Sequence, residues 1–203
     1  MTGWQIHEGL ALSLPQANID TDQLIPARFM SVPRADGYGP YLLHDMRRDA
    51  AGSLRPEFPL NRHPDASVLV TRRGFGSGSS REAAVYALAD AGIRAVISPG
   101  FGDIFAANAV NNGLLPAQVN EKTCAELETI LVDGPQTIRI DISSRRVTLG
   151  TFSAGFELDD SWAEKLVNGW DDIDLTMNRA ADITAFKQTR SQTAPWAWPV
   201  AAD

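Results

Sequence analysis

The clearest pattern along the chain is an alternation of short apolar runs and helical segments between residues 67 and 119. The apolar runs are too short for helices and predict buried strands, whereas the segments between them carry apolar residues at helical spacing. The expected order is strand 67–72, helix 80–91, strand 95–98, helix 103–111 and strand 114–119. Such units give neighbouring parallel strands with right-handed crossovers, and open α/β sheets bind ligands at the carboxyl ends of such strands.

Weaker patterns flank this block. The further expected elements are strand 4–14, helix 121–131, a hairpin of 137–141 and 146–149, and helices 159–168 and 178–188. Residues 31–66 are rich in Pro, Gly, Arg and Asp, which predicts a loop excursion with one short helix at 41–46. Residues 1–190 are expected to form one α/β domain, and the tail 191–203 is expected to fray or lie on a partner.

Composition narrows the class of protein. An apolar fraction of 44% and a charged fraction of 21% are ordinary for a folded globular chain. The net charge of -7 and the lack of any Lys/Arg run argue against nucleic-acid binding. No apolar stretch approaches the roughly 20 residues of a membrane span, and the N-terminus lacks a signal-peptide pattern. A cytoplasmic protein without a membrane partner is therefore expected.

Cysteine and histidine usage limits the metal chemistry. Cys124 is the single cysteine, so an internal disulfide and a cysteine-ligated cluster within this chain are excluded. His7, His44 and His63 are scattered without metal-ligand spacing. No metal is therefore expected in this chain, and Cys124 is interpreted as a small, half-buried apolar residue on a helix.

The stretch at residues 74–82, Gly-Phe-Gly-Ser-Gly-Ser-Ser-Arg-Glu, is the strongest candidate for chemistry. Its alternating glycines allow the backbone to approach a ligand closely. The loop enters a helix, whose N-terminus favours anions, and Arg81 adds a planar cation suited to a carboxylate. This combination indicates capture of an anionic ligand beside a serine hydroxyl.

Other interpretations of this loop compete with anion capture. Ser79 and Glu82 also have the spacing of a capping box, which would make Ser79 a helix cap only. A phosphate loop would need a following Gly-Lys-Ser/Thr, and a dinucleotide fingerprint would need glycine at position 79. A G-x-S-x-G nucleophile elbow is also absent. The residues alone leave capping and anion binding both open.

Four ordered blocks resemble the small subunits of isopropylmalate dehydratases in the aconitase superfamily. The blocks are the Gly-Ser-Ser-Arg-Glu loop above, Asn-Ile-Asp-Thr-Asp-Gln-Leu-Ile-Pro at 18–26, Phe-Gly-Asp-Ile-Phe at 101–105 with Asn-Asn-Gly-Leu-Leu-Pro at 111–116, and Asn-Gly-Trp-Asp-Asp-Ile-Asp-Leu-Thr at 168–176. The resemblance covers about residues 5–180. It implies a single swivelling domain of β/β/α type, with a mixed or parallel β core flanked by helices.

The resemblance also implies a function. Such subunits take part in the isomerisation of 2-isopropylmalate to 3-isopropylmalate by dehydration and rehydration, in leucine biosynthesis. A [4Fe-4S] cluster is expected in a large partner subunit and none in this chain. The expected partners are that large protein and a small hydroxy-dicarboxylate substrate.

Matching the motif residue by residue implies roles within the loop. Ser79 corresponds to the catalytic base, and Arg81 stabilises it and binds substrate carboxylate together with Ser80. Gly76 and Gly78 are expected to bring backbone against the substrate. Ser79 alkoxide formation is costly, so backbone N–H groups and a cation must stabilise it.

A second segment is expected to contact the substrate. Arg28 is a candidate carboxylate ligand, and Phe29 and Met30 are candidates for an apolar wall around the substituent. The alternative for these three residues is core packing after a turn. Asp20 and Asp22 are interpreted as structural, through Asx turns and capping of backbone N–H groups.

Several positions depart from the family pattern. The smaller or altered residues are Ser77, Ala83, Gly100, Gly102 and the pair at 106–107. The Ser-Ser-Arg core is intact, so the expected class of chemistry is retained. The departures leave open a paralogue for another 2-alkylmalate or a non-catalytic regulatory paralogue, and a free-standing anion-binding protein is a further alternative.

Asp103 is expected to cap a helix.

Overall fold

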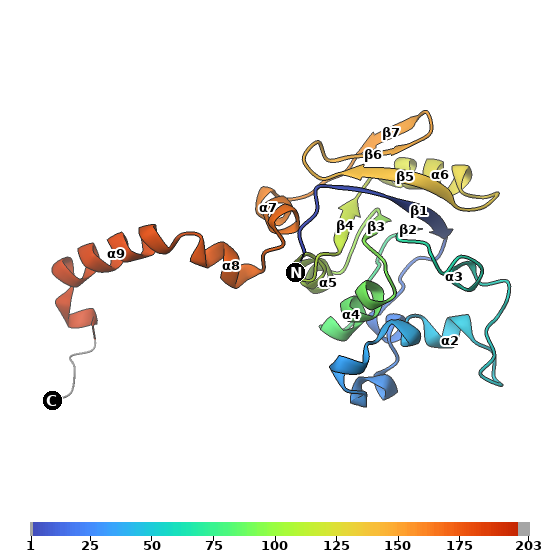
Figure 1. Ribbon diagram of the computed structural model, residues 1–203, viewed down its shortest axis with the longest axis horizontal. Helices are drawn as coiled ribbons and strands as arrows, with labels where there is room; N and C mark the ends of the chain where they lie inside the picture. The colour runs from blue at the N-terminus through green and yellow to red at the C-terminus, as the bar shows by residue number, and fades with distance from the viewer. Residues whose placement is uncertain (1, 199–203) are drawn as a thin grey trace.

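Seven strands form one mixed sheet in the computed structural model, which describes residues 2–198 (Figure 1). Their spatial order is β4-β3-β2-β1-β5-β6-β7. The pairs among β1 to β4 are parallel, and those from β1 through β5 and β6 to β7 are antiparallel. The strands are β1 Ile6–Leu14, β2 Val68–Thr71, β3 Ala95–Ser98, β4 Leu115–Gln118, β5 Gln136–Asp141, β6 Arg146–Leu149 and β7 Phe152–Gly155. This mixed sheet confirms the predicted α/β class.

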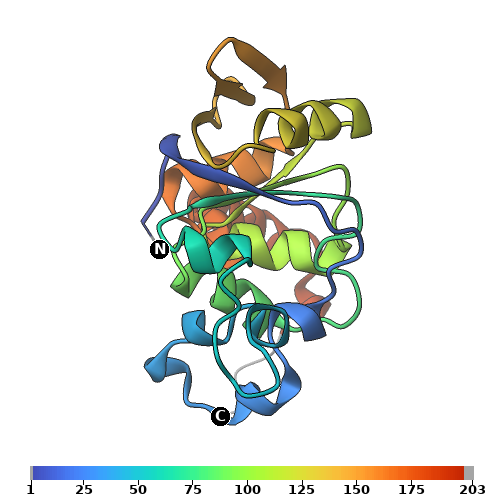
Figure 2. The same cartoon turned by 90° about the vertical axis from the view of Figure 1, so that its right-hand side faces the viewer.

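Helices cover both faces of the sheet (Figure 2). The α-helices are α1 Thr21–Leu24, α2 His44–Arg47, α3 Pro59–Arg62, α4 Glu82–Asp90, α5 Asp103–Asn111, α6 Glu121–Ile130, α7 Asp160–Asn168, α8 Asp172–Met177 and α9 Ala180–Thr193. The 3-10 helices are η1 Ala27–Ser31, η2 Arg34–Asp36, η3 Gly39–Tyr41 and η4 Pro195–Ala197. Within the described residues, none of these helices has the length and apolarity to cross a bilayer.

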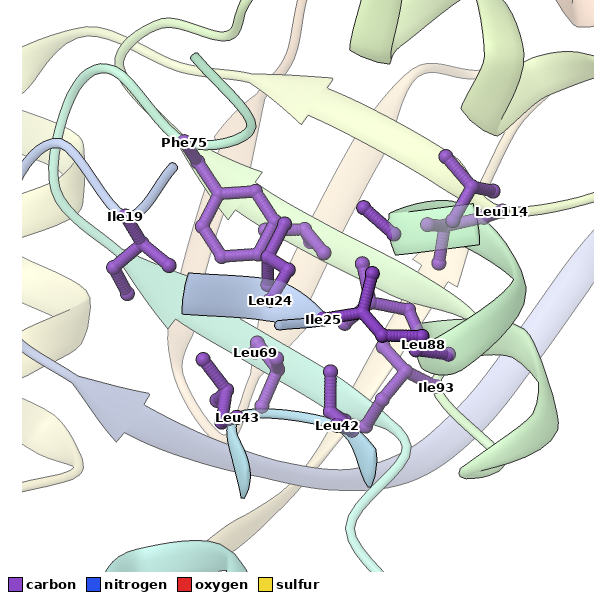
Figure 3. Packing of buried hydrophobic residues seen from close by; sticks show 14 of the residues in the cluster. Ile19, Leu24, Ile25, Leu42, Leu43, Leu69, Phe75, Leu88, Ile93 and Leu114 are labelled. Atoms are coloured by element: carbon purple, nitrogen blue, oxygen red, sulfur yellow. The ribbon is translucent and has the colours of Figure 1, made fainter. Parts of the chain in front are cut away.

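Two apolar clusters sandwich the sheet because successive strand residues point to opposite faces. Leu69 of β2 packs into the cluster that includes α1 and α4, whereas its neighbour Val70 packs into the cluster that includes α6 and α7. Figure 3 shows the first cluster, where Leu24, Phe75 and Leu88 from separate elements converge beside β2. This cluster fixes α1 and the start of α4 relative to each other.

The alternating block predicted from sequence is confirmed in its order. Strands β2, β3 and β4 and helices α4 and α5 lie where the apolar pattern placed them, and α6 and the β5–β6 hairpin also form as predicted. Strand β7, which pairs with β6, was not predicted. Its four residues alternate between half-buried and exposed, so the apolar signal is weak.

The excursion at residues 31–66 contains short helices that pack into the first cluster. Leu42, Leu43 and Leu60 are buried there. The helix predicted at 41–46 is wrong in its bounds, because η3 ends at Tyr41 and α2 begins only at His44. Leu43 between them has a φ of +50°, which a continuous right-handed helix does not permit.

The C-terminal segment extends away from the sheet as an arm, here defined as residues 171–198 (Figure 1). Neither α8 nor α9 buries a residue, and α8 was not predicted. The helix predicted at 178–188 is α9, which continues to Thr193, with η4 after it. The predicted tail is thus largely helical as far as it is described; residues 199–203 lie outside the described residues.

Cys124 is buried on α6, with its Sγ atom 3.3 Å from the carbonyl oxygen of Thr71. Burial raises the pKa of this thiol to about 11. The thiol is therefore protonated at neutral pH. Its packing on a helix agrees with the predicted apolar role, although the side chain is buried rather than half-buried.

Candidate functional site

The serine loop, residues 74–81, connects β2 to α4 and packs on the glycine loop that follows β3. The backbone N–H groups of Gly74 and Phe75 donate to the carbonyl of Gly100, at 2.8 and 3.2 Å. Phe75 is fully buried, and its ring meets the ring of Phe105 edge-on at a centroid distance of 5.4 Å. The two loops therefore pack against each other at the carboxyl ends of β2 and β3.

Gly76 is required by this packing. It is buried with a φ of +71°, and a Cβ atom there would lie 2.1 Å from the ring of Phe105. Its N–H group also donates to the carbonyl of Ile19 at 2.7 Å. Gly78, by contrast, is exposed with a φ of +102°. The two glycines predicted to face substrate therefore differ, since only Gly78 presents its backbone to solvent.

The segment before α1 holds the serine loop from the other side. Asp20 forms an isolated parallel bridge with Ser77, and the N–H group of Thr21 donates to the Ser77 carbonyl at 3.0 Å. The Asp20 carboxylate accepts from the backbone N–H of Gln23 at 2.7 Å, and the Gln23 side chain accepts from the N–H of Asp20. Asp20 is thus a helix cap, which confirms its structural interpretation.

Ser79 is exposed, and its hydroxyl contacts a buried hydroxyl. The Oγ atom lies 3.0 Å from Oγ1 of Thr21. The capping-box interpretation is wrong, because the N-cap residue of α4 is Arg81 and no side chain caps this terminus. Glu82 instead accepts from the side chain of Asn112 at 2.9 Å. Ser79 lies two residues before the N-cap position, and its hydroxyl contacts Thr21 rather than the first turn of α4.

Arg81 lies between the serine loop and α1. Its side chain is 24% exposed and forms an ion pair with Asp22, whose side chain is 58% exposed. Asp22 was expected to cap backbone N–H groups, but it pairs with this guanidinium instead. The contact uses Nη1, one of the three guanidinium nitrogens, so N–H donors on the other two nitrogens are available for an anion.

The segment predicted to contact substrate forms η1, which follows α1. Arg28 donates to the Asp45 carboxylate at 2.9 Å, and this hydrogen bond is the main cause that lowers the pKa of Asp45 to about 2. Phe29 stacks on Tyr41 at a centroid distance of 4.4 Å, and Met30 is 41% exposed. Across the described residues, no hydrogen bond or ion pair joins these three residues to the serine loop. Ser80, within the loop, is exposed.

One cleft of the described residues has no lining residue from the serine loop. It has a volume of about 630 Å³ and lies between α3 and α6, beside the end of β1. A smaller cleft of about 250 Å³ adjoins the second glycine loop and includes Ala106, one of the departures from the family pattern. Asp103 lines this cleft as the first residue of α5, but Gly102 is the N-cap residue, so the prediction that Asp103 caps the helix is wrong.

The described residues of this chain do not fit a metal cluster. In the part of the chain that the structure describes, no group of three or more His, Cys, Asp or Glu side chains is placed to hold a metal ion. Cys124 is buried and alone.

Thr21 is the residue that sequence reasoning missed. It is buried, with an exposed fraction of 1%, and its hydroxyl lies within hydrogen-bond distance of three Ser79 atoms. The available signal was its place between two aspartates in the 18–26 block. Nothing in the local sequence indicates a partner 58 residues further along the chain.

Comparisons with known proteins identify the family. The aconitase C-terminal domain family matches residues 1–122, and the family formed by the C-terminal domain of the 3-isopropylmalate dehydratase small subunit matches residues 172–197. A 3-isopropylmalate dehydratase small subunit from Shewanella oneidensis is 43% identical, covering 97% of this chain and 99% of that protein. One from Leuconostoc mesenteroides is 44% identical over 90% of this chain and 94% of that protein.

A solved structure extends the likeness to the fold. The crystal structure of 3-isopropylmalate dehydratase from Methanocaldococcus jannaschii aligns with a TM-score of 0.64 and 26% identity. The alignment covers 90% of this chain and 99% of that one. Sequence likeness over nearly the whole chain, together with a shared fold, shows that the chain belongs to the 3-isopropylmalate dehydratase small subunit family, within the aconitase superfamily.

Proposed function

We propose that this chain is the cytoplasmic small subunit of a 3-isopropylmalate dehydratase in leucine biosynthesis, and that its serine loop completes an active site on a large, cluster-bearing subunit. The observation that carries the proposal is the surface at the start of α4. Ser79 and Ser80 are exposed there, Arg81 is partly exposed, and the first turn has no side-chain cap. Uncapped N–H groups and a guanidinium favour a carboxylate at this point.

The residues have distinct roles in this proposal. The substrate is a hydroxy-dicarboxylate, so Arg81 and Ser80 bind a carboxylate. Ser79 removes a proton from the carbon next to the one that carries the hydroxyl group. The hydroxyl group on the neighbouring carbon leaves with the electron pair of its C–O bond, so this hydroxide and the proton held by Ser79 together make up the water that is lost. Both return to the double bond with the two positions exchanged. The [4Fe-4S] cluster of the large subunit supplies Lewis-acid activation of the substrate hydroxyl and carboxylate.

The η1 segment is proposed to set the apolar side of the site. Phe29 and Met30 follow α1 closely, and the ring of Phe29 is held by Tyr41, so a preformed apolar surface faces the substituent. Arg28 is proposed as a second carboxylate ligand. Because Asp45 already neutralises Arg28, carboxylate binding there requires exchange of that partner.

A second candidate is a dehydratase subunit for another 2-alkylmalate. Ala106 lines the cleft of about 250 Å³ beside the second glycine loop, where a larger side chain would occupy space. The two candidates therefore differ in the alkyl group of the substrate. The acid–base residues are the same in both candidates.

Reconstitution tests the proposed function. The purified chain would be mixed with a cluster-loaded large subunit and supplied with 2-isopropylmalate or with 2-alkylmalates of shorter and longer chains. We expect turnover only in the mixture, with one alkyl length preferred. Turnover by the chain alone would contradict the proposal, and a stable complex inactive on every member of the series would identify a non-catalytic paralogue.

The C-terminal arm is proposed to bind the large subunit. A helix of about 14 residues is marginal in water unless another surface covers it. Met177, Phe186 and Trp196 are 63%, 65% and 82% exposed, although each is large and apolar. The arm therefore presents apolar surface that a partner would remove from water.

Introducing charge into the arm should weaken assembly. Phe186→Asp is expected to raise the dissociation constant for the large subunit about tenfold or more, since loss of one buried aromatic anchor costs roughly 2 kcal/mol. Gln188→Asp adds the same charge to an exposed position of α9 and serves as the control. Calorimetric titration measures the dissociation constants of both variants. Equal affinities for Phe186→Asp and wild type would mean that the arm is not part of the interface.

A further inference from the structure

The hydroxyl oxygen of Thr21 lies within hydrogen-bond distance of three atoms of Ser79. Its Oγ1 atom lies 3.0 Å from Ser79 Oγ, 3.2 Å from the Ser79 carbonyl oxygen and 3.3 Å from the Ser79 nitrogen. The backbone fixes this position, because Thr21 opens α1 and its N–H group donates to the carbonyl of Ser77. An exposed fraction of 1% excludes water as the main partner of the hydroxyl.

The donor and acceptor roles follow from the chemistry of these atoms. A backbone N–H only donates and a carbonyl only accepts, whereas a hydroxyl has one proton and two acceptor sites. Thr21 therefore accepts from the Ser79 N–H group and can donate to the Ser79 carbonyl while the neutral Ser79 hydroxyl donates to Thr21. When Ser79 loses its proton, rotation about the Thr21 Cβ–Oγ1 bond alone redirects the Thr21 proton to the negative oxygen.

We propose that Thr21 is a positioning residue that orients Ser79 and donates its rotating hydroxyl proton to the deprotonated form of Ser79. The inference rests on the proposed function, because it acts through Ser79 as the base. A hydrogen bond to a charged oxygen is shorter and stronger than one to a neutral hydroxyl. Thr21 thus favours the reactive state of Ser79 without touching substrate.

Isosteric replacement tests this role in the reconstituted enzyme. Thr21→Val keeps the volume and removes the hydroxyl, and it should lower kcat roughly 10- to 100-fold, the equivalent of one hydrogen bond to a charged group, with KM unchanged. Thr21→Ser keeps the hydroxyl and should retain kcat within about threefold. Thr21→Ala, measured in parallel, also removes the hydroxyl and serves if the valine variant fails to assemble.

The outcomes separate this inference from the function on which it rests. In a Ser79→Ala background, Thr21→Val should cause no further loss, because its effect passes through Ser79. Wild-type kcat in an assembled Thr21→Val or Thr21→Ala enzyme overturns the inference, as does a Thr21→Ser enzyme as slow as Thr21→Val. Full activity of Ser79→Ala alone would instead overturn the proposed function.

Discussion

Ser79→Ala is expected to lower the kcat of the reconstituted enzyme about 10³-fold, the typical contribution of a positioned base. The change removes the exposed hydroxyl that contacts the buried Thr21. Folding should be almost unaffected, because Thr21 keeps its contacts with the Ser79 carbonyl and N–H groups. The free energy of unfolding should therefore fall by about 1 kcal/mol or less.

Ser77→Ala is the matched control for this result. Ser77 lies in the same loop, and its hydroxyl has no hydrogen-bond partner among the described residues, whereas its backbone contacts would remain. Its kcat should stay within about twofold of wild type, in line with the small effect of most surface substitutions. If Ser79→Ala behaved like Ser77→Ala in steady-state assays, Ser79 would not be the base.

Arg81→Lys is expected to lower kcat/KM about 10²-fold, the cost of weakening hydrogen bonds to a charged group. The guanidinium can hold Asp22 with one donor and a substrate carboxylate with others. A lysine ammonium is a single point charge and cannot reproduce this planar fork. Most of the loss should appear in KM, because the group binds substrate.

Arg72→Lys provides the comparison for the arginine variant. Arg72 forms an ion pair with Glu128 of α6, on the opposite side of the sheet from α1, and its side chain is 55% exposed. Such exposed pairs contribute little, so kcat/KM should be unchanged within about twofold. Comparable losses in the two variants would mean that Arg81 acts through general electrostatics rather than by binding substrate.

The sequence predicts the parts of the fold that local patterns determine. Strands β2 and β3 are continuous apolar runs because both of their faces are buried, and α4 and α5 show helical spacing because one side of each packs on the sheet. The resemblance then supplied the domain type and the family. These elements position the serine loop, so its place at the carboxyl ends of the parallel strands could also be predicted.

The parts that sequence could not predict depend on distant contacts. The short helices within residues 27–62 form because residues such as Leu42 and Leu60 pack into the cluster around α4. No helical period indicates elements of three to five residues. The arm is likewise unpredictable in extent, since neither α8 nor α9 carries an apolar stripe facing the sheet.

The candidate site divides in the same way. The motif located Ser79, Ser80 and Arg81, but the local pattern also suggested a cap that the structure excludes. Whether Ser79 caps α4 depends on where the loop is held, and Thr21 and its neighbours hold it by contacts across 58 residues of sequence. Thr21 itself therefore carried no local signal.

A competitive titration tests the central claim most directly, namely that Ser79 acts on a substrate activated by another polypeptide. A fixed amount of cluster-loaded large subunit with substrate would receive wild-type chain until activity saturates, and Ser79→Ala chain would then be added in excess. Activity is expected to fall in proportion to the fraction of wild-type chain that the variant displaces. Saturated activity that persists after full displacement would contradict the account.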